Sequence, residues 1–347
     1  MREHLRIFAA ACFYYGGLVK LARWWTGRSG KHLIILNYHR ATGGDLRRHL
    51  FYLQRHYRIL HLDVALKELS APSEKEDRRT PLALTFDDGY RDNYTVGFTL
   101  ARELQIPVTI FLIPGYIESG DYFWWREGLR LVSRAQVQEA AMAGRIYRLK
   151  RAKDRRALAQ AIDSRLRHAT SVDEREAFLM ATRKALAVPQ SVSAEEKPSL
   201  PLTWAEVLEM KESGWVSFGA HTMHHPILSY LSNPTEVEFE VRECRAVLQR
   251  LLGCSVSAFA YPVGQRQHIG DHARCAVQKA GYDWGLTTIY GFNTRHTEPH
   301  LLRRIEIDVS QHWLVLAAKA AGLWSVFSRL RRMPVIRKCL TSTAWRK

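Results

Sequence analysis

Two adjacent carboxylates, Asp87 and Asp88, constrain this chain more than any other feature of its sequence. They follow residues 81–84, an apolar run of the length of a buried strand, so the pair falls where a strand gives way to a loop. An α/β barrel keeps its chemistry on such loops. Neighbouring carboxylates repel each other, and a metal ion that binds one while the other accepts a proton relieves that repulsion. Because an isolated Asp-Asp-Gly is more often an ordinary acidic turn, this interpretation depends on the rest of the chain.

The composition predicts a packed protein with an anionic neighbour. Hydrophobic residues make up 46% of the 347 residues and aromatic residues 11%, which excludes a disordered chain. The net charge of +17 predicts contact with phospholipid or an acidic polymer. No nucleic-acid-binding motif accompanies this charge, so we expect no nucleic-acid partner. The five cysteines are not clustered and have no C-x-x-C spacing, so we expect neither a disulfide framework nor a thiolate metal site.

Apolar runs alternate with helical patterns along residues 31–312. Strands are predicted over residues 33–36, 107–113, 215–220 and 256–261, and helices over residues 46–57, 94–104 and 234–252. Asn233 and Gly253 provide the cap and the end of the last of these helices. The count approaches seven or eight βα units, which is typical of an α/β barrel.

Residues 121–200 interrupt this alternation with a long, mostly helical and basic stretch. Its length exceeds that of an ordinary barrel loop, so we expect a helical insertion over or beside the active site. The insertion opens with Tyr122, Phe123, Trp124 and Trp125, which could form a sugar platform, although at least two of them are expected in the core. Its basic residues either contact lipid or polymer or are simply solvated.

Both ends of the chain are apolar, aromatic and basic. Within residues 1–30, the uncharged run 7–19 is too short to span a bilayer and has no small-residue cleavage site after it. We expect an amphipathic helix on an anionic membrane, with packing on the protein's own body as the alternative. Residues 313–347 predict a second such helix, near the basic Lys319, Arg329, Arg331 and Arg332. Its apolar stripe consists of Leu316, Ala320, Leu323, Phe327 and Leu330. These segments predict a peripheral protein of the bacterial inner membrane, on a face that the sequence does not specify.

A second polar cluster, residues 221–226, follows the alternating strand 215–220. His221 and His225 are four residues apart, so both rings reach one ion if the backbone turns helically. Together with Asp88 they form a set of two histidines and one carboxylate that leaves room for water. This set suits catalytic zinc and also non-haem iron. His224 is expected to point elsewhere, and any one of these histidines alone would more often be structural.

Three segments resemble, in order, the first three motifs of the polysaccharide deacetylases of carbohydrate esterase family 4, the nodulation chitooligosaccharide deacetylase type. They are Thr85-Phe86-Asp87-Asp88-Gly89, His221-Thr222-Met223-His224-His225-Pro226 and Phe259-Ala260-Tyr261-Pro262-Val263-Gly264. The resemblance covers about residues 33–308 and implies a distorted, incomplete (β/α)7–8 barrel. It also implies metal-dependent hydrolysis of N-acetyl groups on sugars.

The same resemblance implies roles for individual residues. Asp87 would be the general base, and Asp88, His221 and His225 would hold a divalent metal. Zinc is favoured, with cobalt, nickel, manganese or iron as alternatives. The backbone N–H of Val263 would stabilise the oxyanion of the tetrahedral intermediate.

Two functional residues of the family pattern are missing from their usual positions, and other residues of this chain are candidates for their roles. The third motif has Ala260 where the family usually has an arginine that orients the base. Arg304, in the alternating, strand-like run 302–307, is our candidate replacement. The family's C-terminal histidine acid is not evident. In the biofilm poly-N-acetylglucosamine deacetylases, a branch of the family, a Tyr-His pair after the first strand carries the acid. Asn37-Tyr38-His39-Arg40 resembles that motif, so His39 is the candidate acid, with a structural hydrogen-bonding role as the alternative.

The sequence therefore predicts removal of N-acetyl groups from N-acetylhexosamine residues of an exopolysaccharide, an envelope glycan or a lipid-linked glycan precursor. One alternative is an O-acetyl esterase or small-amide hydrolase of the same fold. Another is a non-catalytic protein that binds glycan or membrane, but the intact Asp87, Asp88, His221 and His225 argue against it. The oligomeric state is not predicted.

Overall fold

A curled parallel sheet forms the centre of the protein in the computed structural model, which describes residues 2–29, 32–70, 77, 79–189 and 195–324. Within these residues the sheet has eight strands in the order β10-β1-β3-β4-β7-β8-β9, with β2 paired to β3. The strands are β1 (Ile34–Tyr38), β2 (Arg58–Ile59), β3 (Pro81–Phe86), β4 (Val108–Leu112), β7 (Val216–Ala220), β8 (Ala258–Ala260), β9 (Trp284–Leu286) and β10 (Ile305–Glu306). Every pairing between neighbouring strands is parallel, so the carboxyl ends of the strands meet at one edge.

The two ends of the sheet approach each other and give it the shape of an incomplete barrel. β10 pairs with β1, and an isolated parallel bridge joins Leu286 at the end of β9 to Leu302, shortly before β10. Strands β1 and β4 are buried along their whole length, as a parallel sheet covered on both faces requires. The prediction of a distorted, incomplete α/β barrel is confirmed.

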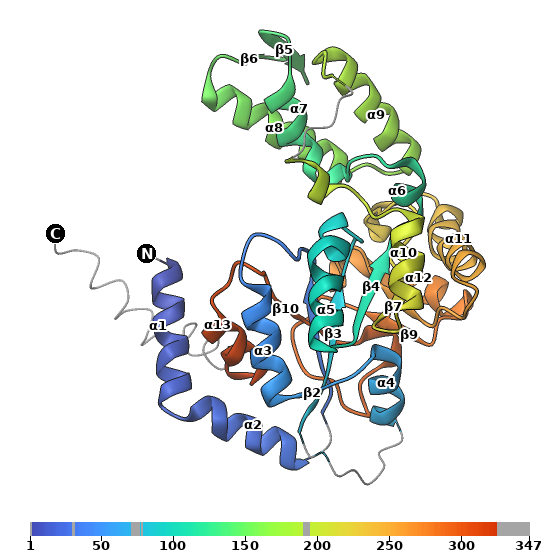
Figure 1. Cartoon of the computed structure of the whole chain (residues 1–347). Coiled ribbons are helices and arrows are strands. Elements are labelled where there is room, and N and C mark those ends of the chain that lie inside the picture. The colour runs from blue at the N-terminus through green and yellow to red at the C-terminus, as the bar shows by residue number, and fades with distance from the viewer. Residues whose placement is uncertain (1, 30–31, 71–76, 78, 190–194, 325–347) are drawn as a thin grey trace, which may run out of the picture.

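Helices cover the outside of the sheet (Figure 1). They are α3 (Leu46–His56), α4 (Leu62–Ser70), the π-helix η1 (Asn93–Phe98), α5 (Thr99–Leu104), α6 (Pro114–Ser119), α10 (Trp204–Glu212), the 3₁₀-helix η4 (Leu228–Tyr230), α11 (Pro234–Leu252), α12 (Arg266–Lys279), the 3₁₀-helix η5 (Pro299–Leu301) and α13 (Trp313–Ala320). The predicted ends of α11 are confirmed, because the Asn233 side chain accepts a hydrogen bond from the Thr235 N–H and Gly253 adopts a left-handed conformation.

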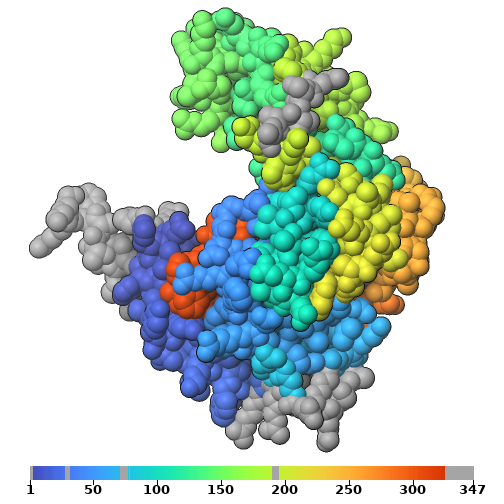
Figure 2. Space-filling view, in the orientation of Figure 1, coloured from blue at the N-terminus to red at the C-terminus, as the bar shows by residue number. Residues whose placement is uncertain are grey.

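The insertion forms a lobe that projects from the barrel (Figures 1 and 2). It contains the 3₁₀-helices η2 (Trp124–Arg126) and η3 (Lys197–Ser199), α7 (Glu127–Arg134), β5 (Glu139–Met142), β6 (Arg145–Arg148), α8 (Ala152–Arg167) and α9 (Val172–Ala185). The hairpin β5–β6 is an addition to the predicted, mostly helical content. Ala143 and Gly144 join its strands, both at positive φ, which matches the twist of a tight two-residue hairpin.

The N-terminal segment is two helices rather than the single one expected. α1 (Arg2–Tyr15) and α2 (Leu18–Ser29) meet at an angle of 65°. The break falls at Gly16 and Gly17, and Gly17 has φ of 79°, a conformation that glycine adopts without strain. In the described part of the chain no single helix is long and apolar enough to cross a membrane, and α1 and α2 meet that criterion only as a bent pair.

The described start of the C-terminal segment packs against the protein. Leu316 and Ala320, the first members of the predicted apolar stripe, are fully buried, and Leu323 packs on the same core. α13 also contacts α1, where Ala10 is buried beside Leu314. Phe327 and Leu330, together with Arg329, Arg331 and Arg332, lie outside the described residues.

A substitution at Gly219 tests the packing beneath the site. A Cβ added there would overlap the buried ring of Phe111 on β4 and lie 3.1 Å from the Ala258 carbonyl oxygen. We expect Gly219→Ala to lower the free energy of unfolding by about 1–3 kcal/mol, because neither neighbour has room to move. Gly97→Ala is the matched control, since its Cβ would make only ordinary van der Waals contacts, with Ala41 Cβ at 3.5 Å and the Asp92 carbonyl oxygen at 3.9 Å. Denaturant unfolding curves measure both, and equal effects would contradict this account.

Candidate active site

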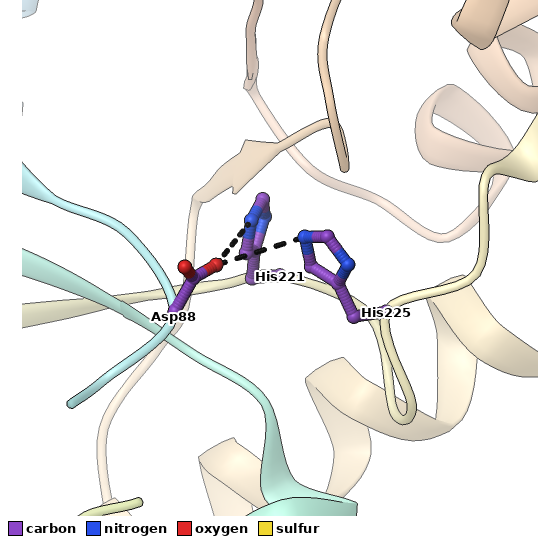
Figure 3. Close-up of side chains that lie close together, drawn as sticks. All are labelled: Asp88, His221 and His225. Carbon is purple, nitrogen blue, oxygen red and sulfur yellow. Dashed lines mark ion pairs between the residues drawn. The ribbon is translucent and has the colours of Figure 1, made fainter. Parts of the chain in front are cut away.

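Three buried side chains converge at the carboxyl edge of the sheet. Asp88 lies in the loop after β3, and His221 and His225 lie in the turn after β7. The Nε2 atoms of His221 and His225 are 3.4 Å and 3.6 Å from the same Asp88 oxygen, Oδ1, and the side chains point toward one another (Figure 3). The structure thus brings together the three residues that the sequence predicted as metal ligands.

The geometry of this triad fits a divalent cation. One potential ligand atom from each residue lies within 4.8 Å of the others. Ligands at ~2.1 Å from one tetrahedral ion are about 3.4 Å apart, close to the separations of the two nitrogens from Asp88. His221 Nδ1 lies 2.7 Å from the Ala260 carbonyl oxygen, so Nδ1 carries a proton and Nε2 is directed at Asp88.

The electrostatics of the two imidazoles also suit metal binding. Burial first, and then the nearby charges of His221 and Arg175, hold the pKa of His225 well below its ordinary value, so this ring is neutral. Burial alone would lower the pKa of His221, but the hydrogen bond to Asp88 and the charges of Asp87 and Asp88 outweigh burial and raise it. A cation binding here would therefore compete with a proton for His221 Nε2.

Strained backbone is concentrated at this site. Asp88, Thr222, His225 and Val263 all have φ between 56° and 73°, a region that residues other than glycine seldom enter. The His225 N–H donates to Thr222 Oγ1 at 2.9 Å, which holds the turn between the two histidines. Such strain costs about 1–3 kcal/mol per residue and persists only where the surrounding structure enforces it.

Asp87 is buried and pairs with Arg304, which precedes β10. Arg304 Nη1 and Nη2 donate to the two carboxylate oxygens of Asp87 at 2.7 Å and 2.8 Å. Arg304 is 0% exposed and also donates from Nε to the Thr287 carbonyl oxygen at 2.9 Å. Burial alone would raise the pKa of Asp87, but Arg304 outweighs it and lowers the pKa to about 2. Asp87 is therefore ionised at neutral pH, and Arg304 has the contact that the missing family arginine would make.

The comparisons with known proteins agree with this geometry. The family model for polysaccharide deacetylases matches residues 74–285, which is most of the chain and includes all three motifs. The chain belongs to the polysaccharide deacetylase family. As a member of that family it is a deacetylase, a hydrolase. A search of curated protein sequences returns no match.

Solved structures support the fold of this deacetylase. The deacetylase PplD of Streptococcus pyogenes in complex with acetate is 19% identical and has a TM-score of 0.54, with 83% of this chain and 98% of that chain covered. IcaB from Ammonifex degensii is 16% identical with a TM-score of 0.54, covering 84% and 97% of the two chains. The BpsB deacetylase domain from Bordetella bronchiseptica is 17% identical with a TM-score of 0.50, covering 80% and 97%.

Val263 and His39, the remaining predicted residues, follow β8 and β1 of the deacetylase at the carboxyl edge of the sheet. The Val263 N–H donates no hydrogen bond to any acceptor within the described residues, and its φ of 59° is unusual for a β-branched residue. His39 follows β1, and its charge contributes to lowering the pKa of both Asp87 and His225, which places it near them. Its neighbour Tyr38 is buried in the core, where its hydroxyl lies 3.2 Å from His49 Nδ1.

The insertion supplies three contacts to the histidine turn that the sequence did not predict. Trp124 Nε1 donates to the His225 carbonyl oxygen at 2.9 Å, and the Trp125 ring lies with its centroid 4.2 Å from that of His225. Arg175 of α9 donates to the His224 carbonyl oxygen at 2.9 Å. Phe123 and Trp124 are buried, which confirms that at least two residues of the aromatic quartet belong to the core.

Glu240 of α11 holds the same turn from the barrel side. Its buried carboxylate accepts from the His224 N–H at 2.9 Å and lies 2.6 Å from His224 Nδ1. This pairing turns the His224 side chain away from the triad, as expected from the sequence. Glu240 occupies an inward position of the predicted helix, where a buried acid is a signal that sequence reasoning could have used.

The pair of Asp87 and Arg304 is expected to be strongly coupled in stability. Arg304→Met leaves a buried carboxylate unpaired and should cost about 3–5 kcal/mol of unfolding free energy. Asp87→Asn in the Arg304→Met background should recover much of that loss, because the unpaired charge is gone. Denaturant unfolding of the wild type, both single variants and the double variant gives the coupling energy. Simple additivity of the two single effects would show that the ion pair does not contribute as described.

Proposed function

We propose that this deacetylase uses a divalent cation to remove N-acetyl groups from N-acetylhexosamine residues of a glycan. The buried triad of Asp88, His221 and His225, directly beside the ionised Asp87, is the observation that carries the proposal. Zinc suits two imidazoles and one carboxylate best, and cobalt, nickel, manganese or iron are compatible with the same ligands. An exopolysaccharide, an envelope glycan or a lipid-linked precursor would present such residues.

The residues around the triad suggest how the reaction would proceed. A divalent cation held there would supply a Lewis acid and a bound water of lowered pKa. Asp87, fixed by both Arg304 contacts, would accept the proton of the attacking water. The free Val263 N–H would donate to the oxygen that becomes negative in the tetrahedral intermediate.

The departing amine needs a proton, because an unprotonated nitrogen leaves too poorly for the intermediate to collapse forward. His39 is our candidate for this acid. It follows β1 at the carboxyl edge of the sheet, and its charge acts on both Asp87 and His225. A histidine suits proton donation near neutral pH.

Metal analysis combined with acetate release tests the assignment of ligands and base. We expect Asp88→Ala, His221→Ala and His225→Ala each to lose bound metal and activity, because each removes one ligand from the triad. Asp87→Asn should keep the metal and lose activity by roughly 10²–10⁴-fold, because it removes only the proton acceptor.

The readouts are metal content of the purified protein and acetate released from N-acetylated and O-acetylated glycans. Acetate from O-acetyl esters alone would replace the proposed amide hydrolysis by ester hydrolysis. If Asp87→Asn lost the metal while Asp88→Ala kept it, the two carboxylates would have to exchange roles. A folded wild-type protein without bound metal would overturn the proposal.

His39→Ala should bind metal normally and lose activity by roughly 10²–10⁴-fold. The alkaline limb of the pH–rate profile should also disappear, because activity would no longer require a protonated group at this position. His296→Ala is the matched control, since His296 lies exposed at the surface. Near-normal turnover of His39→Ala would exclude His39 as the acid.

A further inference from the structure

The N-terminal helices have an apolar face directed to solvent. On α1, Leu5, Phe8 and Tyr15 are 50%, 68% and 75% exposed, and they recur at spacings of three and seven residues on one side of the helix. On α2, four further large apolar side chains are exposed. They are Leu18, Leu21, Trp24 and Trp25. We call these seven residues the N-terminal apolar face.

The opposite sides of the same helices are fixed to the protein. Ala10 is fully buried against α13, and the Tyr14 ring lies 5.0 Å from the ring of Trp313. On α2, Val19 is buried in the main core and Ala22 packs against it. Packing on the body and an exposed apolar face therefore coexist, although the sequence presented them as alternatives.

The concentration of this face distinguishes it from the scattered apolar residues of an ordinary surface. Seven of the fifteen large hydrophobic side chains exposed in the described residues belong to α1 and α2. The others are spread over the insertion and the barrel helices, for example Leu129, Ile146 and Met180. Figure 1 places α1 and α2 along the outer edge of the barrel, away from the insertion.

Charge favours one occupant for this face. Arg6 and Lys20 are exposed on the two helices, and the whole chain has a net charge of +17. A second copy of the chain would bring the same positive charges to the contact, whereas an anionic lipid surface complements them. Tryptophan and phenylalanine beside basic residues are typical of helices that lie in the headgroup region.

We propose that α1 and α2 dock the protein onto an anionic bilayer, with the N-terminal apolar face inserted in the plane of the headgroups. The helices lie on the bilayer without crossing it, because leaving the body would expose the buried Ala10 and Val19. This inference is independent of the proposed function, since no residue of the face contacts the triad.

Vesicle co-sedimentation of the full chain tests this docking. We expect the wild type to sediment with vesicles of phosphatidylglycerol and phosphatidylcholine in equal parts. The triple variant Phe8→Gln, Leu21→Gln, Trp25→Gln should bind at least ~10-fold more weakly, because its apolar anchors are gone. The matched control is Leu129→Gln, Ile146→Gln, Met180→Gln, whose side chains are similarly exposed on the insertion and whose loss should leave binding unchanged.

The contribution of charge is separated by Arg6→Gln and Lys20→Gln. Each should weaken binding to the anionic vesicles by roughly 5-fold and leave weak binding to pure phosphatidylcholine unchanged. Unfolding curves and acetate release from a soluble glycan should stay at wild-type values for every variant. A failure of docking is thus distinguishable from a failure of the catalytic proposal.

Three results would overturn the docking proposal. One is a wild-type protein that does not sediment with anionic vesicles at low salt. Another is equal binding by the wild type and the triple variant of the apolar face. The third is a wild-type dimer in sedimentation velocity that the triple variant converts to a monomer without any change in vesicle binding, which would assign the face to a second copy of the chain.

Discussion

The ion pair between Asp87 and Arg304 is the interaction on which the rest of the site depends. A carboxylate inside a barrel is costly unless a counter-charge and hydrogen bonds replace its water. Arg304 provides both to Asp87, and it also donates to Asn37 Oδ1 on β1 and to the Thr287 carbonyl oxygen after β9. It lies between the bridge at Leu302 and the start of β10, where the two ends of the sheet approach each other. The residue that ionises the candidate base therefore also joins the ends of the barrel.

Much of the site could be predicted because a parallel sheet brings the carboxyl ends of its strands to one edge. Asp88 and His221 each follow an apolar strand. Once the βα units are assigned to one barrel, both residues are expected at the same edge of its sheet. Arg304 could be nominated for the same reason, since it borders a predicted strand. The pairing distance and the fixed ring orientation of His221 required the structure, because they depend on carbonyl groups such as that of Ala260.

The parts that could not be predicted depend on contacts between segments without a local signal. Nothing around Arg175 indicates that α9 reaches the His224 carbonyl oxygen, because the position of the insertion is a tertiary property. The break at Gly16 and Gly17 was present in the sequence, but an apolar run around it obscured two helices with different directions. The hairpin turn at Ala143 likewise lacks the Asn or Asp that usually marks such turns. The structure was therefore needed to show that the histidine turn is held from two sides, by Trp124 of the insertion and by Glu240 of the barrel.

The long sequence separation within the ion pair sets the order in which its two partners are made during synthesis. Asp87 and Arg304 are 217 residues apart, and the insertion and strands β4 to β9 lie between them in the sequence. A chain emerges from the ribosome N-terminus first, so Asp87 is made 217 residues before its counter-charge. The insertion packs around a hydrophobic cluster that also includes Tyr90, Ile113 and Tyr116 of the barrel, and every residue of this cluster precedes Arg304 in the chain. A nascent chain that stops before residue 304 would contain Asp88, His221 and His225 and would still lack the counter-charge of the carboxylate beside them.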